Sequence, residues 1–124
     1  MKVVNFGSLN LDYLYHVPHT AVAGETISAK SYAISVGGKG LNQSIAAARA
    51  GVSVCHAGLV GKEGGILVDC LRESGVDVSL VQPTSAPQGH AMIQINDDGN
   101  NCIIVFGGSN QEVSREYIDQ TLEG

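Results

Sequence analysis

A glycine-rich turn runs straight into an alanine-rich segment, and this feature limits the possible folds of the chain more than any other. Residues 37–40 read Gly-Gly-Lys-Gly, and residues 41–50 carry four alanines with apolar side chains at helical spacing. We predict a helix over 41–50 that Gly51 ends. The apolar segments 2–8 and 52–60 on either side are typical of buried strands. Strand and helix alternation of this kind predicts right-handed crossovers and a parallel sheet.

A second group of strands is expected from weaker signals. Residues 12–17 and 26–36 alternate weakly between apolar and polar side chains, and residues 90–96 and 101–107 flank Asn-Asp-Asp-Gly-Asn, which indicates a hairpin. We expect all four runs to be strands. The other expected elements are a helix over 65–74, a strand over 76–82 and a helix over 114–122. The predicted fold class is α/β, with a Rossmann-like parallel sheet and flanking helices.

Composition excludes several classes of protein. The chain has 124 residues and a net charge of −5, and its seven Lys and Arg residues are scattered, so no basic surface for nucleic acid is expected. No apolar run approaches the ~18 residues of a membrane span. Polar residues interrupt the first segment too early for a signal peptide, which favours a cytoplasmic protein. We expect Cys55, Cys70 and Cys102 to be reduced thiols, mostly buried, with Ile66, Cys70 and Leu71 facing inward from the helix over 65–74.

Two pairs of polar residues are candidates for a binding site. Asn10 and Asp12 stand two apart at the expected end of the first strand, so extended backbone places both on one face. A carboxylate accepts hydroxyl hydrogens while an amide both donates and accepts, a combination that suits a polyhydroxylated ligand. Lys39 and Asn42 lie three apart and share one side of the first helical turn. The alternatives are an ordinary turn for the first pair and a glycine turn with a surface helix for the second.

Other kinds of site fit the sequence less well. Residues 38–43 nearly match a dinucleotide-binding G-x-G-x-x-G, but Gln43 replaces the glycine that permits close packing of helix on strand. A P-loop is excluded because Glu63 follows Lys62 where Ser or Thr is required. His16 and His19 are interpreted as a surface pair and not as metal ligands. Glu25 is interpreted as a structural hydrogen-bonding partner.

The motifs resemble those of one family, the ribokinase-like (PfkB) carbohydrate kinases. Residues 37–44, followed by Gly51 and Gly61, are similar to the first signature of that family. Residues 7–12, Gly-Ser-Leu-Asn-Leu-Asp, resemble its first strand with the sugar-contacting Asn-x-Asp. Residues 23–26 resemble its Pro-Gly-Glu-Thr turn with alanine for proline, and residues 108–110 resemble its Gly-Ala-Asn. One stretch, residues 61–65, departs from the pattern, because Lys62 stands where an acid is usual.

The resemblance implies a set of sugar-binding residues and the partners of the protein. The sugar-binding set is Asn10, Asp12, Gly38, Lys39, Gly40 and Asn42. The resemblance also implies that the strands at about 12–36 and 90–107 form an antiparallel β lid over the sugar. It further implies a homodimer formed through this lid sheet. ATP and Mg²⁺, with K⁺ as a further candidate, are the cofactors it implies for a full-length member.

The catalytic Gly-Ala-Gly-Asp of the family has no counterpart in residues 1–124. We therefore expect the chain to be the amino-terminal part of a ribokinase-like domain, an incomplete fold with no catalytic, cofactor-binding or metal-ligating residue of its own. Its expected function is that of an ATP-dependent sugar kinase of which it carries the sugar-binding part, inactive alone because phosphoryl transfer depends on positioned charge. The alternative is a non-catalytic sugar-binding or interaction module derived from such a kinase.

Overall fold

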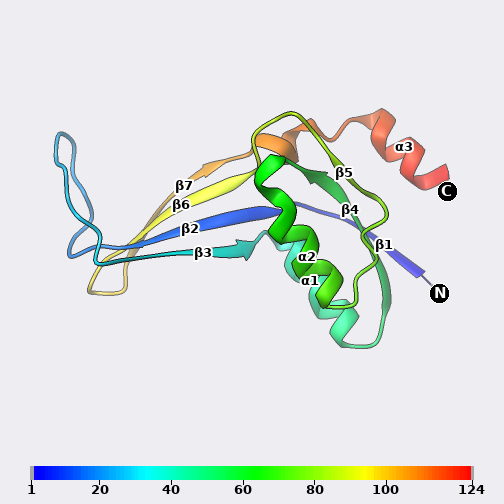
Figure 1. The fold of residues 1–124 in the computed structure, drawn as a ribbon, viewed down its shortest axis with the longest axis horizontal. Coiled ribbons are helices and arrows are strands. Elements are labelled where there is room, and N and C mark those ends of the chain that lie inside the picture. The colour runs from blue at the N-terminus through cyan, green and yellow to red at the C-terminus, as the bar shows by residue number, and fades with distance from the viewer. Residues whose placement is uncertain (1, 124) are drawn as a thin grey trace.

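A computed structural model describes residues 2–123 of the chain (Figure 1). Strands and helices alternate in the first part, as the sequence predicts, and a second set of strands projects from them. The elements, in order, are β1 (Lys2–Phe6), β2 (Asn10–His16), β3 (Ser31–Gly37), α1 (Lys39–Arg49), β4 (Ser53–Val60), the 3₁₀ turn η1 (Lys62–Gly64), α2 (Gly65–Glu73), β5 (Val81–Pro83), β6 (His90–Ile95), β7 (Asn101–Phe106), the 3₁₀ turn η2 (Gly108–Glu112) and α3 (Arg115–Glu123).

The predicted parallel sheet is present, with the strand order β1-β4-β5. Helices pack on both of its faces. Asn5 of β1 donates hydrogen bonds toward α1, to Gly40 O at 3.0 Å and to Ser44 Oγ at 2.9 Å. The next residue, Phe6, faces the other way and stacks edge-on against Tyr117 of α3, with ring centroids 6.5 Å apart. Because successive side chains of a strand point to opposite faces, Asn5 and Phe6 contact helices on opposite sides of the sheet.

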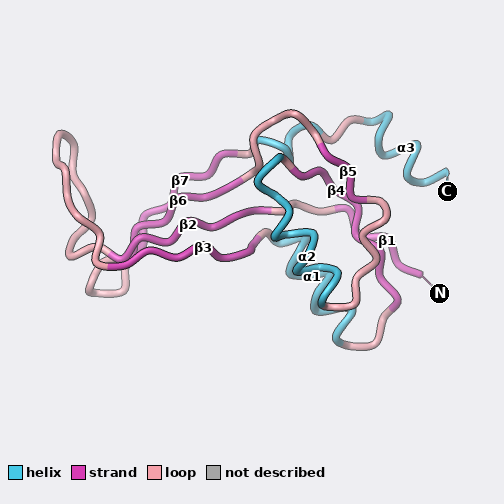
Figure 2. The backbone as a smooth tube through the Cα atoms, in the orientation of Figure 1, coloured by secondary structure: helices cyan, strands magenta, loops and turns pink. Residues whose placement is uncertain are grey.

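The lid is a four-stranded sheet of order β3-β2-β6-β7 that extends away from the parallel sheet (Figure 2). The predicted hairpin is formed by β6 and β7, which pair antiparallel, as do β2 and β3. The expectation of a purely antiparallel lid is wrong, because β2 and β6 pair parallel. The chain leaves the lid after β3, passes through α1, β4, α2 and β5, and re-enters it beside β2 in the same direction.

The core forms between the sheets and the helices α1 and α2. Leu9, Leu41, Leu67 and Leu71 are fully buried. The inward face of α2 differs from the prediction, because Leu67 is buried in place of Ile66, which is exposed. Leu67 and Leu71 stand four residues apart and therefore share the buried face of α2, whereas Ile66 lies on another side of the helix.

Three expectations about burial and strand length need correction. Strand β1 is not mostly buried, because Val3 and Val4 lie exposed on its free edge. Cys102 lies exposed on β7, whereas Cys55 is buried and Cys70 partly so; all three are free thiols. The expected strand over 76–82 reduces to β5, with one isolated bridge at Asp77. Its side chain accepts a hydrogen bond from Ser79 N–H at 2.9 Å, a local turn that interrupts the ladder.

The segment between β2 and β3 is a loop over residues 17–30, so the strand expected from residue 26 begins only at Ser31. Glu25 organises this loop, since its carboxylate accepts from Val22 N–H at 3.2 Å and pairs with His19. These contacts confirm a structural role for Glu25. Among residues 2–123, no helix has the length and apolar character needed to cross a membrane.

Candidate functional site

The candidate site lies where the lid joins the parallel sheet. Residues 7–9 connect β1 to β2, and the end of β3 leads directly into α1. Leu41 N–H donates to Ser8 O at 3.1 Å, and Asn10 pairs with Gly37 in the ladder of β2 and β3. The structure thus brings Asn10, Gly38 and the start of α1 together. Asn10 and Asp12 open β2 and do not end the first strand, a correction to the sequence-based placement.

Asp12 provides a partly buried carboxylate beside this junction. Its ladder neighbours are Ser35 and Ala91, and a Cβ at Gly37 would lie 2.5 Å from its Oδ2. No residue in the described part of the chain donates a hydrogen bond to the Asp12 side chain. Burial raises the pKa of Asp12 above its usual value of 3.8. A desolvated carboxylate with unused acceptor positions is suited to receive hydrogen bonds from ligand hydroxyls.

Two glycines of the predicted set allow close backbone contact. Gly38 precedes α1 with φ 103° and ψ 136°, and a Cβ there would lie 2.7 Å from Ser8 O. Gly40 is buried, and a Cβ on it would overlap the backbone of Gly7. Only glycine fits at either position, so both shape the floor of the site through packing.

Lys39 and Asn42 occupy the first turn of α1 and are exposed. Neither side chain makes a hydrogen bond or ion pair to another residue within 2–123. Their spacing of three places them on one side of the helix, as predicted. Both are therefore available to a ligand above the helix start.

A buried polar network holds α1 against β1 beneath the site. His56 is fully buried; its Nδ1 lies 2.7 Å from Ser44 Oγ and its Nε2 lies 3.0 Å from Gly7 O. Burial lowers the pKa of His56 below 6.5, against an opposing contribution from the Gly7 hydrogen bond. The neutral ring donates from Nε2 to Gly7 O and accepts at Nδ1 from Ser44, which in turn accepts from Asn5. No sequence motif in residues 2–123 marked His56, Ser44 and Asn5 as one network, because they come together only in the folded chain.

A second polar cluster, which sequence reasoning missed, clamps the connection between β1 and β2. Asn110 of η2 accepts from Leu9 N–H at 2.9 Å and donates to Leu9 O at 3.1 Å and to Asn10 Oδ1 at 2.7 Å. The buried Gln88 also donates to Leu9 O, at 2.6 Å. The family-like Gly-Ser-Asn at 108–110 was the available signal, but it carried no assigned role.

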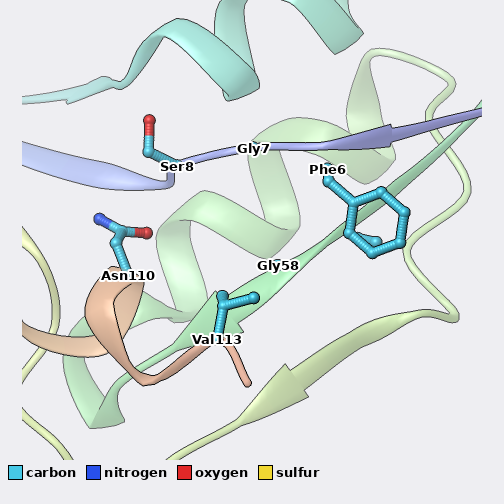
Figure 3. Close-up of a pocket in the computed structure, with 7 residues that line it drawn as sticks. Phe6, Gly7, Ser8, Gly58, Asn110 and Val113 are labelled. Carbon is cyan, nitrogen blue, oxygen red and sulfur yellow. The ribbon is translucent and has the colours of Figure 1, made fainter. Parts of the chain in front are cut away.

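A hollow of about 220 Å³ lies beside the clamp, on the face of the sheet opposite α1 (Figure 3). None of the six predicted residues lines it. Its lining consists of Phe6, Gly7, Ser8, Ala57, Gly58, Asn110 and Val113. Asn10 nevertheless lies next to the hollow, because its Oδ1 accepts a hydrogen bond from Asn110, one of the lining residues. Within the described chain, no group of three or more His, Cys, Asp or Glu side chains is arranged to hold a metal ion.

Comparison with known proteins gives a consistent result. The family model described as pfkB family carbohydrate kinase matches residues 1–123. The ribokinase of Haemophilus influenzae is 32% identical over 118 residues, covering 93% of this chain and 39% of that protein. The solved ribokinase of Cryptococcus neoformans in complex with ADP superposes with a TM-score of 0.82 at 36% identity, over 87% of this chain and 35% of that one.

A third relative is the structure of Arabidopsis thaliana ribokinase complexed with ribose and ATP. It matches with a TM-score of 0.81 and 31% identity, over 95% of this chain and 41% of that one. The chain thus spans well under half the length of these relatives.

Proposed function

This chain belongs to the pfkB family of carbohydrate kinases, and we propose that it is the sugar-binding and lid part of a ribokinase-type enzyme. The structural neighbours confirm the expected fold class, a parallel sheet with helices and a lid of ribokinase type. The proposed reaction is transfer of a phosphoryl group from ATP to a hydroxymethyl group of a sugar. No finding supports the alternative of a non-catalytic module.

The observation that carries the proposal is the pairing of Asp12 with Asn10. Both side chains belong to β2 and, being two residues apart, leave the same face of the lid. Asp12 supplies a partly buried acceptor, and Asn10 supplies an amide. Two adjacent hydroxyls of a pentose match this pair, while Lys39 and Asn42 supply further contacts from α1. We include Gly38 and Gly40 as the glycines that let the sugar approach the backbone.

The nucleotide belongs to the same proposal. Solved relatives carry ADP, or ribose with ATP, which supports the use of a nucleotide by the enzyme of which this chain is a part. ATP supplies the phosphoryl group, and Mg²⁺ and K⁺ are proposed to accompany it. We assign none of these groups to residues 1–124 and name no catalytic residue among them. A cytoplasmic location, where ATP is available, completes this part of the proposal.

We further propose that the protein dimerises through the lid. The register of the four strands divides the lid into two faces, and the face opposite Asp12 is rich in large apolar and aromatic side chains. Tyr15 and Tyr32 stack there with ring centroids 5.1 Å apart. We call this the outer face, and it consists of Tyr13, Tyr15, Tyr32, Ile34, Met92, Ile104 and Phe106. Tyr32, Ile34, Met92, Ile104 and Phe106 are exposed, and so large an apolar area favours a second copy as its cover.

A chimera tests the kinase proposal. Residues 1–123 would replace the matching part of the Haemophilus influenzae ribokinase, and ribose-dependent ATP turnover would be measured. We expect turnover in the chimera, loss of at least tenfold in kcat/KM with Asp12→Asn, and no loss with the matched control Asp98→Asn at the tip of the lid. A folded chimera that binds ATP but shows no ribose-dependent turnover would refute the proposal.

A further inference from the structure

We propose that Asn110 fixes the hydrogen-bonding polarity of Asn10, so that Asn10 meets a bound sugar only as a donor. This inference rests on the proposed sugar-binding role of Asn10 and assigns to Asn110 the part of a positioning residue. It starts from the hydrogen bonds of one backbone unit, Leu9, which lies between the parallel sheet and the lid.

The backbone of Leu9 determines which end of the Asn110 amide is oxygen. Leu9 N–H can only donate, so the Asn110 atom 2.9 Å from it is the acceptor Oδ1. The other Asn110 atom is therefore Nδ2, which lies 3.1 Å from Leu9 O and 2.7 Å from the side chain of Asn10. Because Nδ2 can only donate, the Asn10 atom facing it must be Oδ1. The Nδ2 of Asn10 is left facing away from the clamp.

The packing around Asn110 prevents this arrangement from relaxing. A Cβ at Gly89 would overlap Asn110 Nδ2, so the glycine leaves room for the amide and little else. The buried Ser109 anchors the same turn, since its N–H donates to Pro87 O at 2.8 Å and its Oγ accepts from Gly89 N–H at 2.9 Å. Asn110 N–H itself donates to Gly107 O at 3.0 Å. The contacts of Gly89, Ser109 and Gly107 thus fix the position of Asn110 in η2.

The fixed orientation of the Asn10 amide limits which chemical groups a ligand can place beside it. Asn10 Nδ2 has no acceptor within residues 2–123, and Asp12 has no donor, although both lie on one face of β2. The pair therefore presents one donor and one acceptor, two residues apart. A ligand must offer an oxygen that accepts from Asn10 and, close to it, a hydroxyl that donates to Asp12. Vicinal hydroxyls satisfy this requirement, whereas a protonated amine facing Asn10 does not, because it has no acceptor.

The hydrogen bonds between Asn110 and Asn10 can be tested without any sugar. In the ¹⁵N-labelled chain, we expect both side-chain amide protons of Asn110 to exchange slowly with solvent and those of Asn10 to exchange fast. Asn110→Asp replaces the donor by a second acceptor, so the Asn10 amide should turn round, donate to the new carboxylate and become protected. Protected Asn10 protons in the unsubstituted chain, or no change on Asn110→Asp, would overturn the inference.

A double-mutant cycle that measures D-ribose affinity tests whether Asn110 affects sugar binding through Asn10. We expect Asn10→Ala and Asn110→Asp each to weaken ribose binding about tenfold, as loss of one hydrogen bond implies, and Asn110→Asp to add less than about twofold once Asn10 is alanine. Gln88→Met is the matched control, because Gln88 also holds Leu9 O but does not contact Asn10. Its effect on ribose affinity should be the same in both backgrounds.

The outcomes separate the two claims. Ribose binding with an additive Asn10 and Asn110 cycle would overturn the inference and leave the proposed function standing. Absence of ribose binding, with the expected exchange pattern of both amides, would refute the proposed function and leave the polarity of Asn10 established. An expected exchange pattern together with a non-additive cycle supports both.

Discussion

Replacing Gly38 by alanine should damage the chain more than replacing any glycine of similar backbone conformation in open space. Gly38 has φ 103° and ψ 136°, and its new Cβ would lie 2.7 Å from Ser8 O and 3.1 Å from Ser8 C. The matched control is Gly51→Ala, since Gly51 has φ 93° and a Cβ added there would meet no atom within 4 Å. Both substitutions thus place a side chain at a strained positive φ, and only Gly38→Ala adds an overlap with backbone.

The magnitudes follow from these two contributions. A side chain at such a φ costs about 1–2 kcal/mol, and reduced freedom of the unfolded chain returns about 0.4–1 kcal/mol, so Gly51→Ala should lower the free energy of unfolding by about 1 kcal/mol. Overlap with Ser8, which backbone shifts must relieve, adds about 1–3 kcal/mol. We expect Gly38→Ala to cost about 3 kcal/mol in all, which is a large share of the roughly 5–15 kcal/mol typical of a domain.

Urea denaturation followed by circular dichroism measures both values, and ribose calorimetry completes the comparison. Gly38→Ala should lower the urea midpoint about three times as far as Gly51→Ala and weaken ribose binding, because Ser8 must move away from the start of α1. Gly51 lies at the far end of that helix, so its variant should keep the affinity. Equal losses of stability for the two variants would refute the claim that Gly38 is required by its contact with Ser8.

Four further predictions concern ribose binding, its pH dependence, acid stability and assembly. Asp12→Ala should cost about 1–3 kcal/mol of ribose binding by calorimetry and Lys39→Ala less, since water replaces an exposed ammonium; equal losses would contradict the assignment. Because burial raises the pKa of Asp12, ribose affinity should fall as pH drops through that raised value, above 3.8, and a flat profile would contradict it. Because the pKa of His56 is lowered in the folded chain, its contribution to the free energy of unfolding is fully present above pH 6.5 and is lost as the pH falls from 6.5 toward the folded-state pKa. His56→Gln should therefore make the urea midpoint less dependent on pH across that range. An unchanged pH dependence would argue against a buried neutral ring. Ile104→Asp on the outer face should yield monomers in sedimentation, whereas Val105→Asp, equally exposed on the opposite face (66% against 65%), should not; the reverse would place the interface on the wrong face.

Local chemistry made much of the fold predictable. The glycines before α1 and the alanines within it defined that helix to within two residues at its start, and Gly51 ended it with the expected positive φ. The Asn-Asp-Asp-Gly-Asn turn between β6 and β7 defined the hairpin. In both cases residues close in sequence determine the conformation, and tertiary contacts do not override it.

The errors arose where distant contacts or a single side chain decide the outcome. The parallel pairing of β2 with β6 depends on the path of more than seventy intervening residues, which no local pattern records. The side chain of Asp77 captures Ser79 N–H and stops a strand that hydropathy alone would continue. In the candidate site, motif and spacing proposed Asp12 and Gly38 but gave Asn110 no role. It lies 101 residues from the Leu9 backbone that it clamps, and its role is visible only in three dimensions.

The central claim is that a sugar binds where β2 begins beside the start of α1. Titrating D-ribose into the ¹⁵N-labelled chain and following the backbone amide spectrum tests it most directly. We predict saturable shifts at Asn10, Asp12, Gly38 and Asn42, with the outer-face residues Tyr32 and Ile34 unmoved and the shifts abolished by Asp12→Ala. Ribose that leaves the spectrum unchanged, or that shifts only residues remote from Asp12, would contradict the account.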